Sequence, residues 1–117
     1  GTEMSFIPLL SSATRAQSTT STSANHTIDL ADRLIIVTGG TPTITLPSAD
    51  STGYDSNQGL FFTVATWGGT ATLARAGSDT IGDASATSKS IAAYSSITVT
   101  VSGSAGWIIV STSGTVT

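Results

Sequence analysis

The sequence predicts an all-β protein, and within that class a small antiparallel β-sandwich of jelly-roll-like form. Serine and threonine fill 41 of the 117 positions. Threonine alternates with branched apolar residues, as in residues 43–46 and 97–101, and this period of two is typical of strands. Turn-forming residues separate the short runs, and no helical period of convincing length occurs. A sandwich or barrel is therefore favoured over a parallel sheet with crossover helices.

The first 26 residues differ from the rest and predict an extended arm or a linker from an upstream domain. Residues 6–10 form a short apolar patch around Pro8, and residues 11–25 are almost entirely Ser, Thr, Ala, Gln and Asn. Such a stretch buries too little apolar surface to order by itself. One interpretation is a flexible leader, and the other is an arm whose apolar patch docks on a neighbouring subunit or an upstream domain. The second is favoured, because an exposed apolar patch is a liability on a monomer.

The remaining residues, 27–117, are expected to form the β-sandwich domain. The expected strands span residues 27–30, 34–38, 43–46, 60–66, 71–74, 90–92, 96–102 and 107–111. The breaks between them carry turn chemistry, as at Gly39-Gly40 and Gly68-Gly69. The last two strands, joined across residues 103–106, are expected to form a hairpin.

Three apolar runs break the alternation, at residues 34–37, 60–62 and 107–110. Successive side chains of a strand face opposite sides of the sheet, so apolar residues on both phases indicate that both faces are covered. One face can be the core of the domain, and an interface between subunits is the natural cover for the other. The alternative is that these strands lie centrally and are covered by loops. The residues expected in the core or the interface are Leu34, Ile36, Phe61, Phe62, Val64, Trp107 and Ile109.

The composition excludes several classes of function. A net charge of −3 with only 9% charged residues argues against nucleic acid, which requires a basic face, and against an anionic membrane surface. No apolar run approaches the roughly 20 residues that span a bilayer. The absence of cysteine removes disulfides, thiol catalysis and cysteine metal sites. We therefore expect a non-enzymatic protein without cofactor or metal, stabilised by oligomerisation as small folds often are.

A series of short motifs follows in order along residues 27–111. A strand ends in Thr-Ile-Thr-Leu-Pro-Ser-Ala (43–49), a glycine precedes an apolar-Thr-Val strand (59–64), and Gly106-Trp107-Ile108-Ile109 closes the region. Between them lie the segments 68–69, 70–73, 77–82 and 95–99. In order and spacing this region resembles a module found at the ends of bacteriophage tail fibres and tailspikes, and in some head fibres.

The resemblance implies a trimeric β-sandwich that holds three chains together and can display a surface for a host receptor. It implies an extracellular virion location on the phage tail, an upstream tailspike or fibre domain as a partner, and bacterial surface polysaccharide as a ligand. Catalysis in tailspikes generally resides in an upstream β-helical body, so none is implied here. The chain departs from the family at one turn, where Ala65-Thr66-Trp67 stands before Gly68-Gly69 instead of a Lys-Asn-type turn.

Candidate binding residues come from the longest loop and from aromatic side chains beside turns. Loops carry binding residues disproportionately, and Trp or Tyr beside a turn can stack on a sugar ring. The residues expected to bind carbohydrate are Trp67, Tyr54, Asp50, Asp55 and Asn57. A stand-alone carbohydrate-binding module on the same scaffold remains an alternative, and so does a capsid decoration protein if Met4 is the initiator.

Two other constellations favour structural roles. His26 is the only histidine, and although Asp29 is near it in sequence, a catalytic triad also needs an activated nucleophile and no nucleophile-elbow pattern is present. Asp79 and Asp83 flank a glycine-containing turn. We expect them to cap backbone groups or to pair with Arg75, rather than to hold a cation or act as a glycosidase pair.

Overall fold

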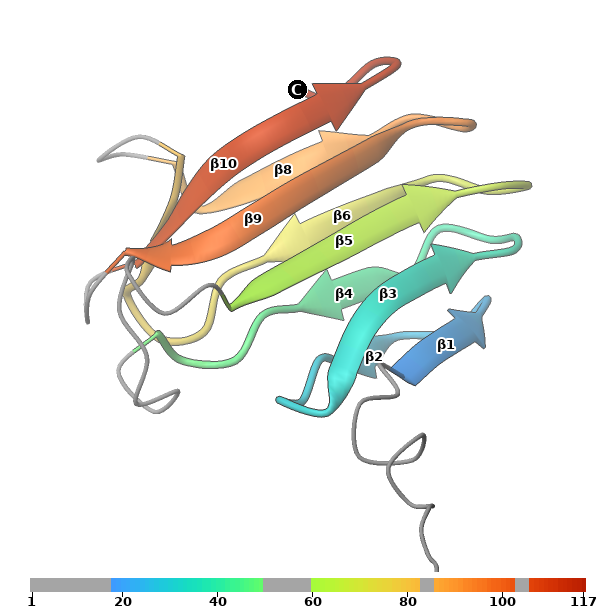
Figure 1. The fold of residues 1–117 in the computed structure, drawn as a ribbon. Helices are drawn as coiled ribbons and strands as arrows, with labels where there is room; N and C mark the ends of the chain where they lie inside the picture. The colour runs from blue at the N-terminus through green and yellow to red at the C-terminus, as the bar shows by residue number, and fades with distance from the viewer. Residues whose placement is uncertain (1–17, 50–59, 83–85, 103–105) are drawn as a thin grey trace, which may run out of the picture.

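The computed structural model describes residues 18–49, 60–82, 86–102 and 106–117. This part of the chain is all-β, without helices, and forms two mixed sheets (Figure 1). The six-stranded sheet contains, in spatial order, β1 (Ser18–Thr22), β3 (Asp32–Val37), β5 (Phe61–Thr66), β9 (Ser96–Ser102), β10 (Gly106–Ser113) and β7 (Thr80–Ile81). The four-stranded sheet contains β2 (His26–Thr27), β4 (Thr43–Thr45), β6 (Ala71–Ala74) and β8 (Ser88–Ile91).

From β1 to β6 the chain passes back and forth between the two sheets. As a result β1, β3 and β5 are parallel neighbours in the six-stranded sheet, and β2, β4 and β6 are parallel neighbours in the four-stranded sheet. Parallel neighbours need a crossover connection, which is usually a helix. Here a strand of the opposite sheet provides it, so each successive pair of strands forms one turn of a flattened solenoid.

The expectation of antiparallel sheets with jelly-roll-like form is therefore wrong. Five of the eight strand pairings in the described part of the chain are parallel and three are antiparallel. An alternating pattern reports which face of a strand is buried, but it carries no information on the direction of the neighbouring strand. Parallel pairing does not require helices here, because strands of the opposite sheet serve as the crossovers.

A repeated turn sequence marks successive solenoid turns. Gly39-Gly40-Thr41, between β3 and β4, recurs as Gly68-Gly69-Thr70, between β5 and β6. The strands that follow are in matching register, with Thr43 beside Thr72 and Ile44 beside Leu73. Such internal similarity is typical of stacked repeats.

The C-terminal part of the chain ends the parallel stack. Strand β9 lies antiparallel to β5, and β8 lies antiparallel to β6. The expected hairpin is confirmed, since β10 pairs with β9 in antiparallel register. The chain then crosses to the other sheet, where Val116 forms a bridge with Ile91 of β8.

Each of the eight expected strands overlaps an observed strand, namely β2 to β6 and β8 to β10, although the expected strand 27–30 shares only Thr27 with β2. Two strands were missed. The first, β1, lies within the expected arm and forms an edge of the six-stranded sheet beside β3, and residues 1–17 lie outside the described residues. Polar residues 18–22 are held in a strand by backbone hydrogen bonds to the apolar strand β3, so their own composition does not predict a strand. The second, β7, has only two residues.

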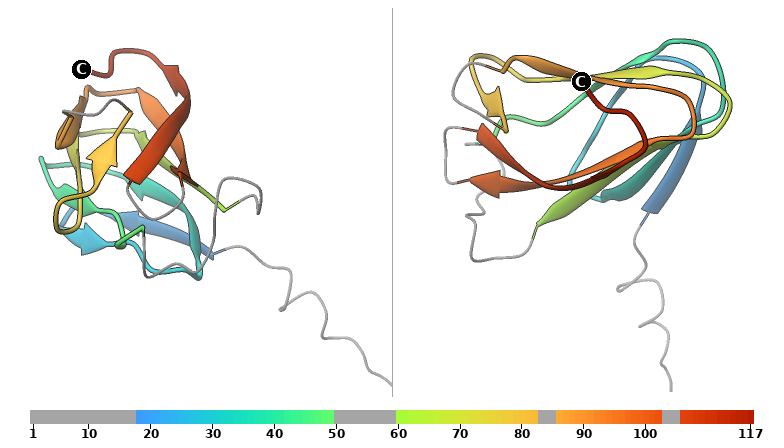
Figure 2. Two further views of the ribbon diagram at one scale, coloured as in Figure 1. Left: turned by 90° about the vertical axis from the view of Figure 1, so that its left-hand side faces the viewer. Right: turned by 90° about the horizontal axis from the view of Figure 1, so that it is seen from above.

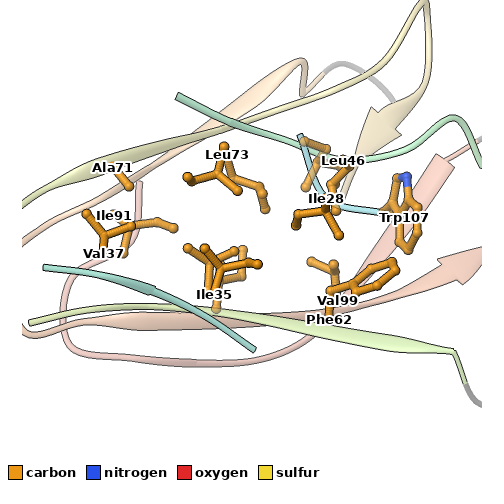
Figure 3. Packing of buried hydrophobic residues seen from close by; sticks show 14 of the residues in the cluster. Ile28, Ile35, Val37, Leu46, Phe62, Ala71, Leu73, Ile91, Val99 and Trp107 are labelled. Atoms are coloured by element: carbon orange, nitrogen blue, oxygen red, sulfur yellow. The ribbon is translucent and has the colours of Figure 1, made fainter. Parts of the chain in front are cut away.

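The two sheets form two layers when viewed along the strands (Figure 2), and one hydrophobic core fills the space between them. Ile35 and Val37 of β3 face Ala71, Leu73 and Ile91 of the other sheet (Figure 3). Two acidic side chains, Asp32 and Asp79, are also buried in the described part of the chain. At one end, the rings of Phe62 and Trp107 pack with their centroids 5.5 Å apart.

Candidate functional site

Trp67 is the one predicted carbohydrate-binding residue that the structure describes, because Asp50, Tyr54, Asp55 and Asn57 lie outside the described residues. It follows the last residue of β5, and its side chain is 69% exposed. The structure brings it beside Tyr94, which is exposed to the same extent. The two rings meet edge to face, with centroids 5.5 Å apart and planes at 82°.

The aromatic pair lies on a stack of turns at one end of the strands, the right-hand end in Figure 1. We define the turn array as residues 23–25, 38–42, 67–70, 92–95 and 114–115. Backbone hydrogen bonds join each turn to the next. Thr38 N–H donates to the Thr22 carbonyl at 2.9 Å, Trp67 N–H to the Val37 carbonyl at 2.8 Å, and Ala92 N–H to the Thr115 carbonyl at 3.0 Å. These bonds fix the aromatic pair to a continuous backbone framework.

Close packing of the turns requires glycine at more than one position, and a side-chain carbon at Gly68 would lie 2.7 Å from the Thr38 carbonyl oxygen. A side-chain carbon at Gly69 would lie 2.5 Å from the carbonyl carbon of Gly39 and 2.6 Å from the carbonyl oxygen of Gly40. Only a residue without a side chain allows two backbones to approach so closely. The repeated Gly-Gly sequence thereby allows the turn that begins with Trp67 to pack closely against the preceding turn.

Tyr94 has an unusual backbone conformation for a large side chain. Its φ is +58°, and no other non-glycine residue in the described part of the chain has a positive φ. The residue after it is held firmly, because Ser95 N–H donates to Thr66 Oγ1 at 3.0 Å and Thr115 N–H donates to Ser95 Oγ at 2.9 Å. Thr66 Oγ1 also donates to the Ala92 carbonyl at 2.6 Å. A buried polar network therefore imposes the left-handed conformation on an exposed tyrosine.

The turn array contains no charged residue. The charged residues of the described part of the chain all lie outside it, at Asp29, Asp32, Arg33, Arg75, Asp79 and Lys89. The turn array carries hydroxyl groups instead, and Thr70 and Thr115 of these turns are exposed. The surface around the aromatic pair is therefore neutral and rich in hydrogen-bonding groups.

A second distinctive surface is the outer face of the six-stranded sheet. Leu34 and Ile36 alternate with the buried Ile35 and Val37 along β3, so they face outward. Phe61 lies on the same face of β5, and the Arg33 guanidinium carbon lies 5.7 Å from its ring centroid. Ile108 and Val110 of β10 complete this face and are 41% and 51% exposed. The outward-facing apolar side chains are Leu34, Ile36, Phe61, Ile108 and Val110. By register, Thr63, Thr98 and Thr100 lie on the same face between those of β3 and β5 and those of β10.

The outer face of the four-stranded sheet has a different character. Ile44 and Leu73 point into the core, so the residues before and after them in β4 and β6 point outward. The residues that pair with these in β2 and β8 lie on the same outer face. They are small and mostly hydroxylated, namely Thr27, Thr43, Thr45, Thr72, Ala74, Ser88 and Ser90. Bulky apolar residues therefore gather on one outer face of the molecule and not on the other.

The residues predicted for a core or a trimer interface divide between the two sides of the six-stranded sheet. Phe62, Val64 and Trp107 are buried in the core of the single chain. Ile109 is partly buried and packs against that core. Leu34, Ile36 and Phe61 lie on the outer face described above, where they are half-buried.

His26 contacts Asp32 instead of Asp29. Its Nε2 lies 2.9 Å from Asp32 Oδ2, and the Thr20 hydroxyl donates to Asp32 Oδ1 at 3.0 Å. Burial of Asp32 acts to raise its pKa, but hydrogen bonds from His26, from the Asp29 backbone N–H and from Thr20 outweigh burial and lower the pKa. Since the Thr20 hydroxyl is bonded to the carboxylate and not to the imidazole, the cluster lacks the geometry of a nucleophile with its base. It joins β1, β2 and β3 at the edge of the core.

Of the acidic pair Asp79 and Asp83, the structure describes Asp79, which has a structural role. Asp79 is buried, and one of its oxygens accepts a hydrogen bond from the Ala49 backbone N–H at 2.8 Å. Its own N–H donates to the Ala76 carbonyl at 3.1 Å, which closes a turn. Asp83 lies outside the described residues.

Two further properties of the described residues bear on function. They include no group of three or more His, Cys, Asp or Glu that could hold a metal ion. Residues 18–49, 60–82, 86–102 and 106–117 also contain no helix that is long and apolar enough to cross a membrane.

The sequence indicates Trp67 as a candidate through its place beside a glycine turn, but nothing near it in the chain pairs it with Tyr94. The signal that could have found the partner is the repeated Gly-Gly-Thr turn, which indicates that turns stack on one another at one end of the molecule. Once turns stack, the aromatic residue of the following turn becomes a neighbour of Trp67. No family model matches this sequence, and a search of curated proteins finds no match.

Proposed function

We propose that this chain is a non-enzymatic structural module of a bacteriophage virion, which assembles as a homotrimer at the end of a tailspike or tail fibre. The proposal combines the motif order of residues 27–111 with the difference between the two outer sheet faces. In the same proposal, the residues before β1 form an arm that leads to an upstream fibre or tailspike domain.

The apolar outer face of the six-stranded sheet is the observation that carries the proposal. Exposed apolar side chains that gather on one face of a protein mark sites of association. Burial of such a surface contributes about 25 cal/mol per Å² of apolar area. The hydroxylated outer face of the four-stranded sheet offers no comparable gain, and we propose that it faces solvent in the assembly.

The experiment compares charged substitutions on the two outer faces. Ile36→Asp and Ile108→Asp place a carboxylate on the apolar face, and Thr45→Asp places one on the hydroxylated face as a matched control. Molar mass is measured by light scattering on a sizing column, with circular dichroism to verify folding. We expect the wild type and Thr45→Asp to be trimers and the two isoleucine variants to be folded monomers. Folded trimers of both isoleucine variants would refute this interface.

Ile109 is not suitable for this test. It packs against the core of the single chain, so Asp at that position would destabilise the fold itself by burying a charge. Loss of the assembly would then have two causes that a mass measurement does not separate.

A further inference from the structure

We infer that Trp67 and Tyr94 form a binding platform for a neutral oligosaccharide, with the sugar ring lying against the two exposed aromatic rings. Binding at this platform is independent of the assembly proposed above, because both rings come from one chain. Only its location at the bacterial surface rests on the proposed function.

The first argument is the exposure of the rings. Trp67 and Tyr94 are each 69% exposed, more than any other large hydrophobic side chain that the structure describes. They meet in an edge-to-face arrangement with centroids 5.5 Å apart, which leaves broad ring surface open to solvent. An aromatic ring offers a sugar flat apolar area, and the tyrosine hydroxyl and the indole N–H add polar contacts.

The second argument is the backbone of Tyr94. A left-handed conformation is unfavourable for a large residue and is normally left to Gly or Asn. The network of Thr66 and Ser95 nevertheless imposes φ of +58° on this tyrosine. Residues held in sparsely populated backbone regions cluster at functional sites. A tyrosine that is this exposed contributes little to the core, so a ligand is the best reason for its presence.

The third argument is charge, which selects the class of ligand. No residue of the turn array is charged, so the platform offers no cation to a phosphate, a sulfate or an acidic peptide. The same turns carry the exposed hydroxyl groups of Thr70 and Thr115. Exposed aromatic rings on neutral turns that carry hydroxyl groups match the surface of a neutral sugar, which combines apolar C–H faces with equatorial hydroxyl groups.

The test applies the full chain to an array of immobilised bacterial-surface oligosaccharides, both neutral and anionic. Calorimetry with each retained saccharide then gives the dissociation constant. Trp67→Ala and Tyr94→Asn remove one ring each, and asparagine tolerates the left-handed conformation. Tyr94→Phe keeps the ring, and Leu30→Ala is the control, because Leu30 is exposed but lies in the loop between β2 and β3, at the opposite end of the strands (Figure 1).

We expect retention of a neutral saccharide that is unchanged by 1 M salt, because no charges take part. Trp67→Ala and Tyr94→Asn should each weaken binding by about tenfold or more. Tyr94→Phe should change it less than threefold, roughly what one exposed hydrogen bond contributes, and Leu30→Ala should leave it unchanged. Tyr94→Asn should keep the wild-type unfolding midpoint, which separates a lost contact from a lost fold.

Three outcomes would overturn the inference. They are retention of no neutral saccharide, retention that survives both ring substitutions, and a change in molar mass on Trp67→Ala, which would make the pair a contact between copies. The same calorimetry on the Ile36→Asp variant separates the two proposals. Saccharide binding by a folded monomer supports the platform even where the assembly fails, and a trimer that binds no saccharide supports the assembly alone.

Discussion

Gly69 lies so close to Gly39 that a side-chain carbon on Gly69 would be 2.5 Å from the Gly39 carbonyl carbon. The contact joins two successive turns of the solenoid, and it places Trp67 above the turn between β3 and β4. The backbone of one turn therefore packs directly against the backbone of the next, which explains why the Gly-Gly sequence recurs.

This contact predicts opposite results for two Gly→Ala substitutions. Gly69→Ala should destabilise the fold by about 1–3 kcal/mol, because the new methyl group overlaps backbone that has little room to move. Gly39→Ala should be neutral or slightly stabilising, since nothing lies within 4 Å of a side-chain carbon there and the unfolded chain loses freedom. Urea denaturation followed by tryptophan fluorescence measures both. Equal stability of the two variants would show that the turns do not stack as described.

Asp32 predicts a specific dependence of stability on pH. Its folded-state pKa is lowered, with burial opposing the shift and the bonds from His26, Asp29 and Thr20 outweighing it. A group of this kind contributes stability that is present above its unfolded-state pKa and is lost as the pH falls through the folded-state pKa. Asp32→Asn should cost about 1–3 kcal/mol at pH 7, the range for charged hydrogen bonds.

The measurement is urea denaturation of wild type and Asp32→Asn from pH 7 down to pH 2. The difference in free energy of unfolding between wild type and Asp32→Asn should be largest at pH 7. It should shrink as the pH falls below the unfolded-state pKa, near 3.8. Thr20→Val, which removes one donor, should show a smaller effect of the same sign. A difference that stays constant over the whole range would contradict a charged Asp32 in the native state.

The hydrogen bonds of the Thr66 hydroxyl are expected to hold the turn that carries Tyr94. This hydroxyl donates to the Ala92 carbonyl and accepts from the Ser95 N–H. Thr66→Val keeps the shape but leaves that buried N–H unpaired, which should cost about 1–3 kcal/mol. Thr63→Val is a matched control in the same strand. Thr63 bonds the Thr98 hydroxyl on the half-buried outer face, where water can replace it, so the cost should stay within about 0.5 kcal/mol.

The urea denaturation midpoints of Thr66→Val and Thr63→Val measure the two stability losses. A larger loss for Thr66→Val indicates that the buried network fixes the Tyr94 turn. Equal small losses would indicate that the left-handed conformation of Tyr94 has another cause.

The sequence predicted the strands well and their pairing poorly. Alternation located β5 and β9 because burial on one face is visible in single residues such as Phe62 and Val99. The direction of pairing depends on how the chain crosses between sheets, which no single strand encodes. Polar β1 was missed for a related reason, since its order comes from hydrogen bonds to β3 and not from its own apolar residues.

The candidate site was predictable in part. Trp67 followed from an aromatic residue beside a glycine turn. Tyr94 could be joined to it only by recognising that the turns stack, because 26 residues separate the two in the chain. The positive φ of Tyr94 had no sequence signal, since the residues that hold this turn are Thr66, at the end of β5, and Thr115, in another turn.

The measurement that tests the central proposal most directly is the absolute molar mass of the wild-type chain, by light scattering on a sizing column, with unheated and heated samples compared in SDS gels. Association through the apolar outer face of the six-stranded sheet predicts three times the chain mass of 11.7 kDa, and a trimer that persists in unheated SDS. A monodisperse monomer over the accessible concentration range would contradict it.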